Sequence, residues 1–535
     1  MKSLVTVTIQ VLFLVTAMLS ASPALAQQHR WTTPFEVSPP VVDETPAQVM
    51  PTPLPAGQKP VRYGSSWFPS LAIGPTGSVH IVWFSGIATT AGLEGSIDLL
   101  MYRELRDGVW SPVNNVVQTA IGGYTVRNSI VMSRDGHLHV LLRMGTTIRH
   151  VSARWDRAWT AAAWSEPHTV GNSGYYVALG VDSMARLHAF WSQGVLDEPG
   201  KPRLECPNCA NLFYRYSDTG GRSWSEPINL SNSPYGDNRP QVKVDSRDRV
   251  HVVWDQGKDW YVGLGKPKQG VYRRSDDRGQ TWRPPVYFTV PDDAVQQTTI
   301  GIAAQDNPIV VYRTLRGSIY YQHSRDGGDT WSAPELLPGV IARDTLGNDL
   351  DQYSMATDGS GNVHLLMVGY PTALSSFVPG AVPSMVLHLV WNGSRWSTPE
   401  IVSANEFYPE WPVIAVSNGN KLHAVWYTRK ADGRPLDERD RYRVWYSSRQ
   451  LDLPETAPLP LFTPVPTAVP EALPTATPIP PSPTPLPADI AATPPISGPP
   501  RWETAALPVL ALALLSPIGL IIGVYALRRR RSRRF

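Results

Sequence analysis

Cysteine is scarce in this sequence. Cys206 and Cys209, in the stretch CPNC, are the only two cysteines in 535 residues. They could supply at most half of a zinc site, and in an exported chain a pair at this spacing favours a small disulfide. We expect that disulfide to stiffen one surface loop.

Other chemical signatures are missing as well. The sequence has no metal-ligand spacing, no glycine-rich phosphate loop and no serine nucleophile elbow. Its formal net charge is only +3, and six arginines among Arg528–Arg534 more than account for this excess. The rest of the chain is near neutral, which argues against nucleic acid as a partner. We therefore predict no cofactor, no metal and no nucleic-acid partner.

The two ends of the chain carry export and membrane signals. Residues 1–26 contain Lys2, an apolar run and a small-residue cleavage site, as in a secretory signal peptide. Residues 501–527 contain an uncharged apolar stretch long enough for a transmembrane helix. The basic tail, residues 528–535, should stay in the cytoplasm. We expect a single-pass type I protein of the cell membrane with an extracellular body.

Proline is concentrated between this body and the apolar stretch. Residues 453–500 are mostly Pro, Thr, Ala and Leu, from which no hydrophobic core can form. Such a composition favours an extended, disordered stalk of polyproline II type. The folded body is then residues 27–452.

A strand–turn–strand unit recurs seven times in the body, about every 57 residues. PSLAIGPTGSVHIVW, Pro69 to Trp83, is one copy, and a Tyr-rich strand and a strand that begins Trp-Ser-x-Pro follow most copies. In six copies a histidine lies mid-strand among alternating apolar residues, which indicates a repeated packing or hydrogen-bonding role. These histidines are His80, His139, His188, His251, His364 and His423.

The last unit lacks its final strand, but the start of the body supplies a match. RWTTPFEVS at Arg30–Ser38 closely resembles RWSTPEIVS at Arg395–Ser403. An N-terminal strand that completes the last sheet is how a β-propeller closes its ring, and closure hides the sheet edges. The sequence predicts an all-β, seven-bladed β-propeller, with six blades as the alternative if the irregular unit Val131–Val170 is not a full blade.

Two turns carry a more specific signature. SDDRGQTW and SRDGGDTW both match the pattern S-x-D-x-G-x-T-W, which resembles the Asp-box (BNR) repeat of the sialidase/neuraminidase-like superfamily. The resemblance covers roughly Arg30 to Asp452 and implies a sialidase-like propeller in which these boxes are structural turns. The matching residues are Ser275, Asp277, Gly279, Thr281 and Trp282, and Ser324, Asp326, Gly328, Thr330 and Trp331.

The resemblance also implies what a catalytic site would need: three arginines, a tyrosine nucleophile paired with glutamate, and an aspartic acid-base. The family's first arginine belongs to an Arg-Ile-Pro signature, where this chain has Trp67-Phe68-Pro69. Arg239, in Asn238-Arg239-Pro240, matches that signature only in part. The weak catalytic candidates are Arg143, Arg239, Arg313, Tyr408, Glu410 and Asp255.

Tryptophans near the long, variable loops suggest a different role. Aromatic rings with a few ionic groups suit sugars, whose ring faces stack while their hydroxyls form hydrogen bonds. The candidate binding residues are Trp83, Trp191, Trp254, Trp411 and Trp426. The alternative is that these tryptophans pack between neighbouring blades.

These observations favour a membrane-anchored surface protein that binds glycans or protein partners through its loop-rich face, without catalysis. The alternative is an exo-sialidase-type or related glycoside hydrolase. A third interpretation is a structural scaffold of the cell envelope.

Overall fold

A computed structural model describes residues 30–38, 62–88, 96–118, 127–172, 174–196, 205, 209–258, 265–343, 352–374, 384–403, 408–429, 442–457 and 460–462. The chain divides into two units, Met1–Val465 and Pro466–Phe535. The second unit lies outside the described residues, as do the predicted signal peptide and the predicted membrane span. Within the described part, none of the helices has the length and apolar character needed to cross a bilayer.

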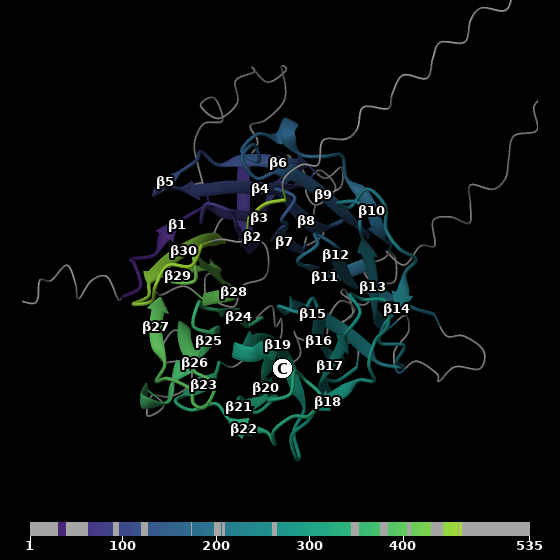
Figure 1. The fold of residues 1–535 in the computed structure, drawn as a ribbon, viewed down its shortest axis with the longest axis vertical. Helices are drawn as coiled ribbons and strands as arrows, with labels where there is room; N and C mark the ends of the chain where they lie inside the picture. Colours follow the sequence, from purple (N-terminus) through teal and green to yellow (C-terminus); the bar gives the residue numbers. More distant parts are fainter. Residues whose placement is uncertain are drawn as a thin grey trace, which may run out of the picture. The chain divides into compact units, whose positions relative to one another are not determined.

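The described residues of the first unit form seven antiparallel sheets arranged around a ring (Figure 1). Blade 1 contains β2 (Arg62–Ile73), β3 (Val79–Ala88), β4 (Ser96–Arg106), β5 (Val109–Trp110) and β6 (Asn114–Gln118). Blade 2 contains β7 (Asn128–Met132), β8 (His137–Met144), β9 (Thr147–Arg154) and β10 (His168–Gly171). Blade 3 contains β11 (Gly174–Val181), β12 (Leu187–Gly194), β13 (Ala210–Ser217) and β14 (Ile228–Asn229). Blade 4 contains β15 (Gly236–Val244), β16 (Val250–Gly257), β17 (Gln269–Ser275) and β18 (Val286–Phe288).

The remaining three blades complete the circle. Blade 5 contains β19 (Val295–Ala303), β20 (Asn307–Thr314), β21 (Ile319–His323) and β22 (Glu335–Leu336). Blade 6 contains β23 (Val340–Ala342), β24 (Ser354–Thr357), β25 (Val363–Pro371), β26 (Met385–Trp391) and β27 (Glu400–Ser403). Blade 7 contains β28 (Tyr408–Ser417), β29 (Lys421–Arg429), β30 (Arg443–Gln450) and β1 (Phe35–Glu36). Short 3₁₀ turns are η3 (Ala161–Ala163), η4 (Ala304–Asp306) and η5 (Thr372–Leu374). The seven-bladed prediction is confirmed, and the irregular second unit is a full four-stranded blade.

The N-terminal strand closes the ring as predicted. Phe35 pairs with Tyr446 and Glu36 with Trp445, so β1 is the outer strand of blade 7. The Thr32 amide donates to Ser448 O at 2.8 Å and extends the ladder. Residues from opposite ends of the body therefore share one sheet. Because β1 pairs with β30, the edge of β30 does not stay unpaired where the ring closes.

The repeated histidines link the second and third strands of six blades. In four blades the histidine Nδ1 is hydrogen-bonded to a tyrosine hydroxyl on the third strand, at 2.7–2.9 Å. These pairs are His80–Tyr102, His188–Tyr214, His251–Tyr272 and His423–Tyr446. In blades 2 and 6 a second histidine takes the place of the tyrosine: His139–His150 and His364–His388. Blade 5 has Ile309 at this position, paired with Gly301.

The two S-x-D-x-G-x-T-W turns satisfy their own polar groups. In the first, Gly279 N–H donates to Ser275 Oγ at 2.7 Å and Thr281 N–H to Asp277 Oδ1 at 2.8 Å. The second turn repeats these bonds between Gly328 and Ser324 and between Thr330 and Asp326. Since each carboxylate is used inside its own turn, neither is available for chemistry.

The first residues of the predicted stalk lie on the propeller. We call residues 453–457 and 460–462 the C-terminal strap. In blade 7, Asn418 Nδ2 donates to Glu455 Oε1 at 2.6 Å, and in blade 2, Phe462 N–H donates to Arg134 O at 2.7 Å. The strap therefore runs from the turn after β28 to the turn after β7. Backbone hydrogen bonds to these turns hold this proline-rich segment without a core of its own.

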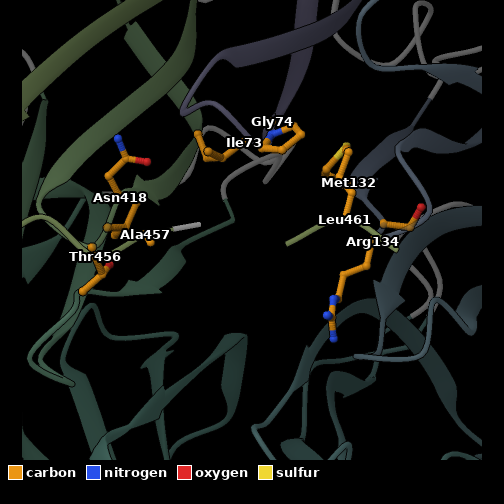
Figure 2. Close-up of a pocket in the computed structure, with 12 residues that line it drawn as sticks. Ile73, Gly74, Met132, Arg134, Asn418, Thr456, Ala457 and Leu461 are labelled. Atoms are coloured by element: carbon orange, nitrogen blue, oxygen red, sulfur yellow. The ribbon is translucent and has the colours of Figure 1, made fainter. Parts of the chain in front are cut away.

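A pocket of about 260 Å³ lies between the strap and these inner turns (Figure 2). Asn418 and Thr456 line one side of it, Met132 and Arg134 the other, and Gly74 of blade 1 lies between them. We call this side of the propeller, which also carries the S-x-D-x-G-x-T-W turns, the turn face.

We expect the strap to stabilise the ring. The Arg134 guanidinium lies 4.8 Å from the Phe462 ring centroid, and Arg134 Nε donates to Pro460 O at 3.1 Å. Phe462→Ala should lower the free energy of unfolding by about 1 kcal/mol, because the cation–π contact is lost. Denaturant unfolding of the full chain measures this.

A double-mutant cycle with Arg134→Ala is the control, since Arg134 also donates to Ser183 O in blade 3. A coupling energy of zero between the two substitutions would show that the contact contributes nothing. Arg395→Ala, at an exposed turn of blade 6, should leave stability unchanged.

Candidate functional site

The inner strands of five blades share a bulge. The strand register shifts between Trp67 and Ser70 in β2, and similar shifts interrupt β11, β15, β19 and β28. Four bulge residues have positive φ angles of 50–58°, although none of them is glycine: Phe68, Arg239, Gln297 and Trp411. Such backbone strain costs on the order of 1 kcal/mol per residue and is concentrated at functional sites.

The strand register places one residue of every blade at this position. The repeated histidine of each blade, or Ile309 in blade 5, pairs with a residue on the inner strand. The residue at the bulge position lies four residues before that pairing partner. We call these seven residues the inner ring: Phe68, Arg127, Tyr176, Arg239, Gln297, Gln352 and Trp411. Trp67-Phe68-Pro69, Asn238-Arg239-Pro240 and Glu410-Trp411-Pro412 are thus copies of one motif. The proline fits because it has no amide hydrogen to donate where the ladder is broken.

Arg127 is enclosed by aromatic residues of three other blades. Its guanidinium lies 3.6 Å from the Phe68 ring centroid and 5.1–5.3 Å from those of Tyr175, Tyr176 and Trp411. The side chain is only 1% exposed, and Nε and Nη1 have no hydrogen-bond partner in the described structure. A buried cation with unsatisfied donors is costly, and cation–π contacts offset only part of that cost. The arrangement suits an anionic group of a ligand.

Arg143 and Arg239 lie beside this cluster. The Arg143 guanidinium is 4.7 Å from the Tyr175 ring centroid, and that of Arg239 is 5.9 Å from Tyr176. Arg313 instead donates to the backbone carbonyls of Thr314 and Arg343. The sequence grouped Arg143, Arg239 and Arg313, whereas the structure gathers Arg127, Arg143 and Arg239 around the tyrosine pair of blade 3.

Asp255 lies next to Arg239 and is used by the backbone. Its carboxylate accepts hydrogen bonds from the amides of Gln297 and Thr298 at 2.8 and 2.9 Å, and lies 3.8 Å from Arg239 Nη1. Burial raises the pKa of Asp255, although Arg239 opposes that effect. These bonds hold the bulge of blade 5 and leave the Gln297 side-chain amide without a partner among the described residues.

Asp237 is a second buried carboxylate near Arg239. Asp237, two residues before Arg239, accepts hydrogen bonds from Trp254 Nε1 and Gln256 Nε2 at 2.7 and 2.9 Å. Burial nevertheless raises the pKa of Asp237 to about 6. A carboxyl group with this pKa changes charge close to neutral pH.

Glu410 has a different partner from the one expected. The Tyr427 hydroxyl donates to Glu410 Oε2 at 2.5 Å, and Arg343 Nη2 donates to Oε1 at 3.3 Å. Tyr408 instead stacks against the Arg343 guanidinium, whose carbon lies 3.4 Å from its ring centroid. The sequence did not indicate Tyr427 as a candidate, because it follows Trp426 on an apolar strand whose pattern predicts a core position. Glu410, Tyr427 and Arg343 are all buried, so this pair presents no open nucleophile.

The predicted binding tryptophans lie in the interior. Trp83, Trp191, Trp254 and Trp426 are at most 1% exposed, and Trp411 packs against Phe68 and Arg127 in the inner ring. Four of them occupy the same position on the second strand of their blades, three residues after the histidine. A sugar cannot reach ring faces that neighbouring blades cover. The burial of these tryptophans therefore favours the alternative, in which they pack between blades.

Cys209 is disulfide-bonded in blade 3. Cys206 is the only other cysteine in the chain and lies outside the described residues.

No protein-family model matches the chain, and no curated protein matches it. Among solved structures, a protein of unknown function from Dyadobacter fermentans is 14% identical, with a TM-score of 0.42 over 72% of this chain and 95% of that one. An ulvan lyase of polysaccharide lyase family PL25 is 9% identical, with a TM-score of 0.49 over 71% and 93%. The NanB sialidase of Streptococcus pneumoniae is 13% identical, with a TM-score of 0.41 over 76% and 72%.

Proposed function

We propose that this protein binds an anionic saccharide at the inner ring of its propeller and does so without catalysis. The observation that carries the proposal is Arg127, a buried guanidinium inside an aromatic enclosure, two of whose nitrogens have no hydrogen-bond partner among the described residues. Gln297 belongs to the same ring, and its side-chain amide has no hydrogen-bond partner among the described residues. A carboxylated sugar offers the negative charge that the buried Arg127 guanidinium lacks.

The burial of Arg127 bears on how a ligand enters. With 1% of the side chain exposed, side chains over the guanidinium must move before an anion can reach it. Binding that needs such a change associates more slowly than binding to a preformed open cleft. We therefore expect slow association.

The proposed setting is the cell surface. The predicted signal peptide, stalk and apolar span would display the propeller outside the cell as a single-pass membrane protein. The C-terminal strap occupies the turn face, so the loop-rich face is the one that the described C-terminal residues leave uncovered.

Arg127→Met tests the proposal on a glycan array with carboxylated, sulfated and neutral glycans. Methionine keeps much of the buried side-chain volume and removes the charge. We expect the full chain to retain carboxylated glycans, and the variant to lose at least about thirtyfold in affinity, as fits the loss of charge-assisted hydrogen bonds.

Arg395→Met removes the same charge from an exposed turn and is the matched control. Unchanged binding by Arg127→Met, in a variant that unfolds at the same denaturant concentration as the parent chain, would exclude the inner ring as the site. Retention of neutral glycans alone would exclude an anionic ligand.

A sialidase-type glycoside hydrolase is the competing hypothesis, and the Tyr427–Glu410 hydrogen bond is what favours it. A tyrosine hydroxyl beside a carboxylate is the pairing such an enzyme needs, but Arg343 neutralises this carboxylate and both groups are buried. Hydrolysis of a fluorogenic sialoside that Tyr427→Phe abolishes would establish the enzyme instead.

A further inference from the structure

The connection between β9 and β10 in blade 2 carries three tryptophans. Trp155 lies under the Arg106 guanidinium, 4.8 Å from ring centroid to carbon, and Trp164 Nε1 donates to Ala158 O at 2.9 Å. Trp159, between them, is 59% exposed. Two indoles thus anchor the connection, while the third is presented to solvent.

The backbone around Trp159 is fixed from both sides. Asn114 Nδ2 of blade 1 donates to Trp159 O at 2.8 Å. Ser165 N–H donates to Ser152 O at 2.8 Å and continues the sheet beyond β9. Because these hydrogen bonds already order the loop, a ligand that stacks on Trp159 does not have to order it on binding. Binding then costs less conformational entropy.

A pocket of about 690 Å³ opens beside this indole. Ala162 and Ala163 line it with small side chains. Arg157, Ser165 and His137 add hydrogen-bonding groups around it. A volume in this range suits one or two sugar rings, and an aromatic face with convergent polar groups is how proteins hold them.

We propose that this pocket is a second saccharide site, in which a pyranose ring stacks on Trp159 and its hydroxyls bond to Arg157 and Ser165. The inner ring is built from the inner strands, whereas this pocket is built from the start of β8, from β9 and from the connection that follows β9. The proposal therefore goes beyond the binding proposed for the inner ring and does not depend on it. Two sites on one propeller would let it hold two residues of one glycan chain, or two chains, with avidity.

Trp159→Ala in the full chain is the test, with the glycan array and titration of intrinsic fluorescence as readouts. The indole is exposed, so its removal should leave stability unchanged. We expect at least one glycan to bind the parent chain and to lose roughly tenfold or more in affinity with the variant, as fits the loss of one stacking contact. Tyr287→Ala, an equally solvent-accessible aromatic at 51% exposure in blade 4, is the control and should change nothing.

The outcomes separate the two sites. Glycans that depend on Trp159 but not on Arg127 establish the blade 2 pocket, whatever happens at the inner ring. If every glycan that the parent chain binds has the same affinity for Trp159→Ala, or if the parent chain binds no glycan, the pocket is not a saccharide site. A proline-rich peptide that quenches the fluorescence of the parent chain, but not of Trp159→Ala, would replace the saccharide with a peptide ligand.

Discussion

Acidification from about pH 7 to about pH 4.5 should destabilise the propeller steeply, because its histidines are buried as neutral rings. Burial lowers the pKa of His80 and of His423 to about 3, and that of His388 to about 4. His80 lies between the hydroxyls of Tyr102 and Ser78, and His423 between those of Tyr446 and Ser417. Hydroxyl partners satisfy a neutral imidazole but cannot balance a buried charge.

The sign of the change in the free energy of unfolding follows from how many protons the folded and unfolded states bind. An unfolded histidine takes up its proton near pH 6.5, whereas these folded histidines stay neutral down to about pH 3–4. Between those values the unfolded state binds more protons, so the free energy of unfolding falls as the pH falls. His80 and His423 should each remove about 2–3 kcal/mol by about pH 4.5.

Denaturant unfolding of the full chain across this pH range measures the effect. His423→Gln removes one of these groups, so stability should fall less steeply between about pH 6.5 and pH 4. His168→Gln, at an exposed position in blade 2, makes the same substitution outside the core and is the control. Equal slopes for the parent chain and His423→Gln would show that His423 titrates in the folded state as it does in the unfolded chain.

Gly279→Ala should be among the most destabilising single substitutions in the chain. Gly279 has a φ of +86°, and a Cβ placed there would lie 1.7 Å from the Tyr214 hydroxyl oxygen of the preceding blade. Tyr214 cannot move away freely, because its hydroxyl is bonded to His188 Nδ1 at 2.8 Å. We expect a loss of about 3 kcal/mol or more, from the strained φ and from the overlap between packed groups.

Gly393→Ala is the matched control. Gly393 has a φ of +92° in a blade 6 turn, but a Cβ there would meet no atom within 4 Å. This variant should show only the conformational cost, about 1 kcal/mol. A similar loss in both variants, measured by denaturant unfolding, would mean that the tyrosine–glycine contact between blades has no role in stability.

Much of the fold could be read from local patterns. The S-x-D-x-G-x-T-W turns are satisfied within eight residues, so their sequence alone indicates their structure. The repeated histidines were predicted to pack or hydrogen-bond, and the structure shows both. The match between Arg30–Ser38 and Arg395–Ser403 predicted the closing strand, which pairs with β30.

The candidate site was harder to predict, because its residues act across blades. Arg127 is one residue before β7, in the least regular repeat, and nothing nearby in the sequence marks it. The strand register does identify Arg127, because Arg127 occupies the same position in blade 2 as Phe68 in blade 1 and Arg239 in blade 4. In six blades the inner-ring residue lies 12 residues before the repeated histidine, so the histidine repeat predicts its position, whereas the family's arginine signature does not. Tryptophans that suggested sugar stacking turned out to be packed between blades.

The sequence by itself determined the repeated unit, the chemistry of the turns and the strand that closes the ring, because each depends on contacts within one repeat or on the similarity of two strands. The structure decided between seven blades and six, because it shows that the irregular second unit forms a four-stranded sheet. Only the tertiary structure decided which side chains meet near the axis and which tryptophan faces water. Closing the ring brings Phe68, Arg127, Tyr176 and Trp411 from four blades into contact. It also buries four tryptophans of the second strands while Trp159 stays exposed. Burial and charge pairing depend on neighbours far away in the chain, and no local pattern specifies those neighbours.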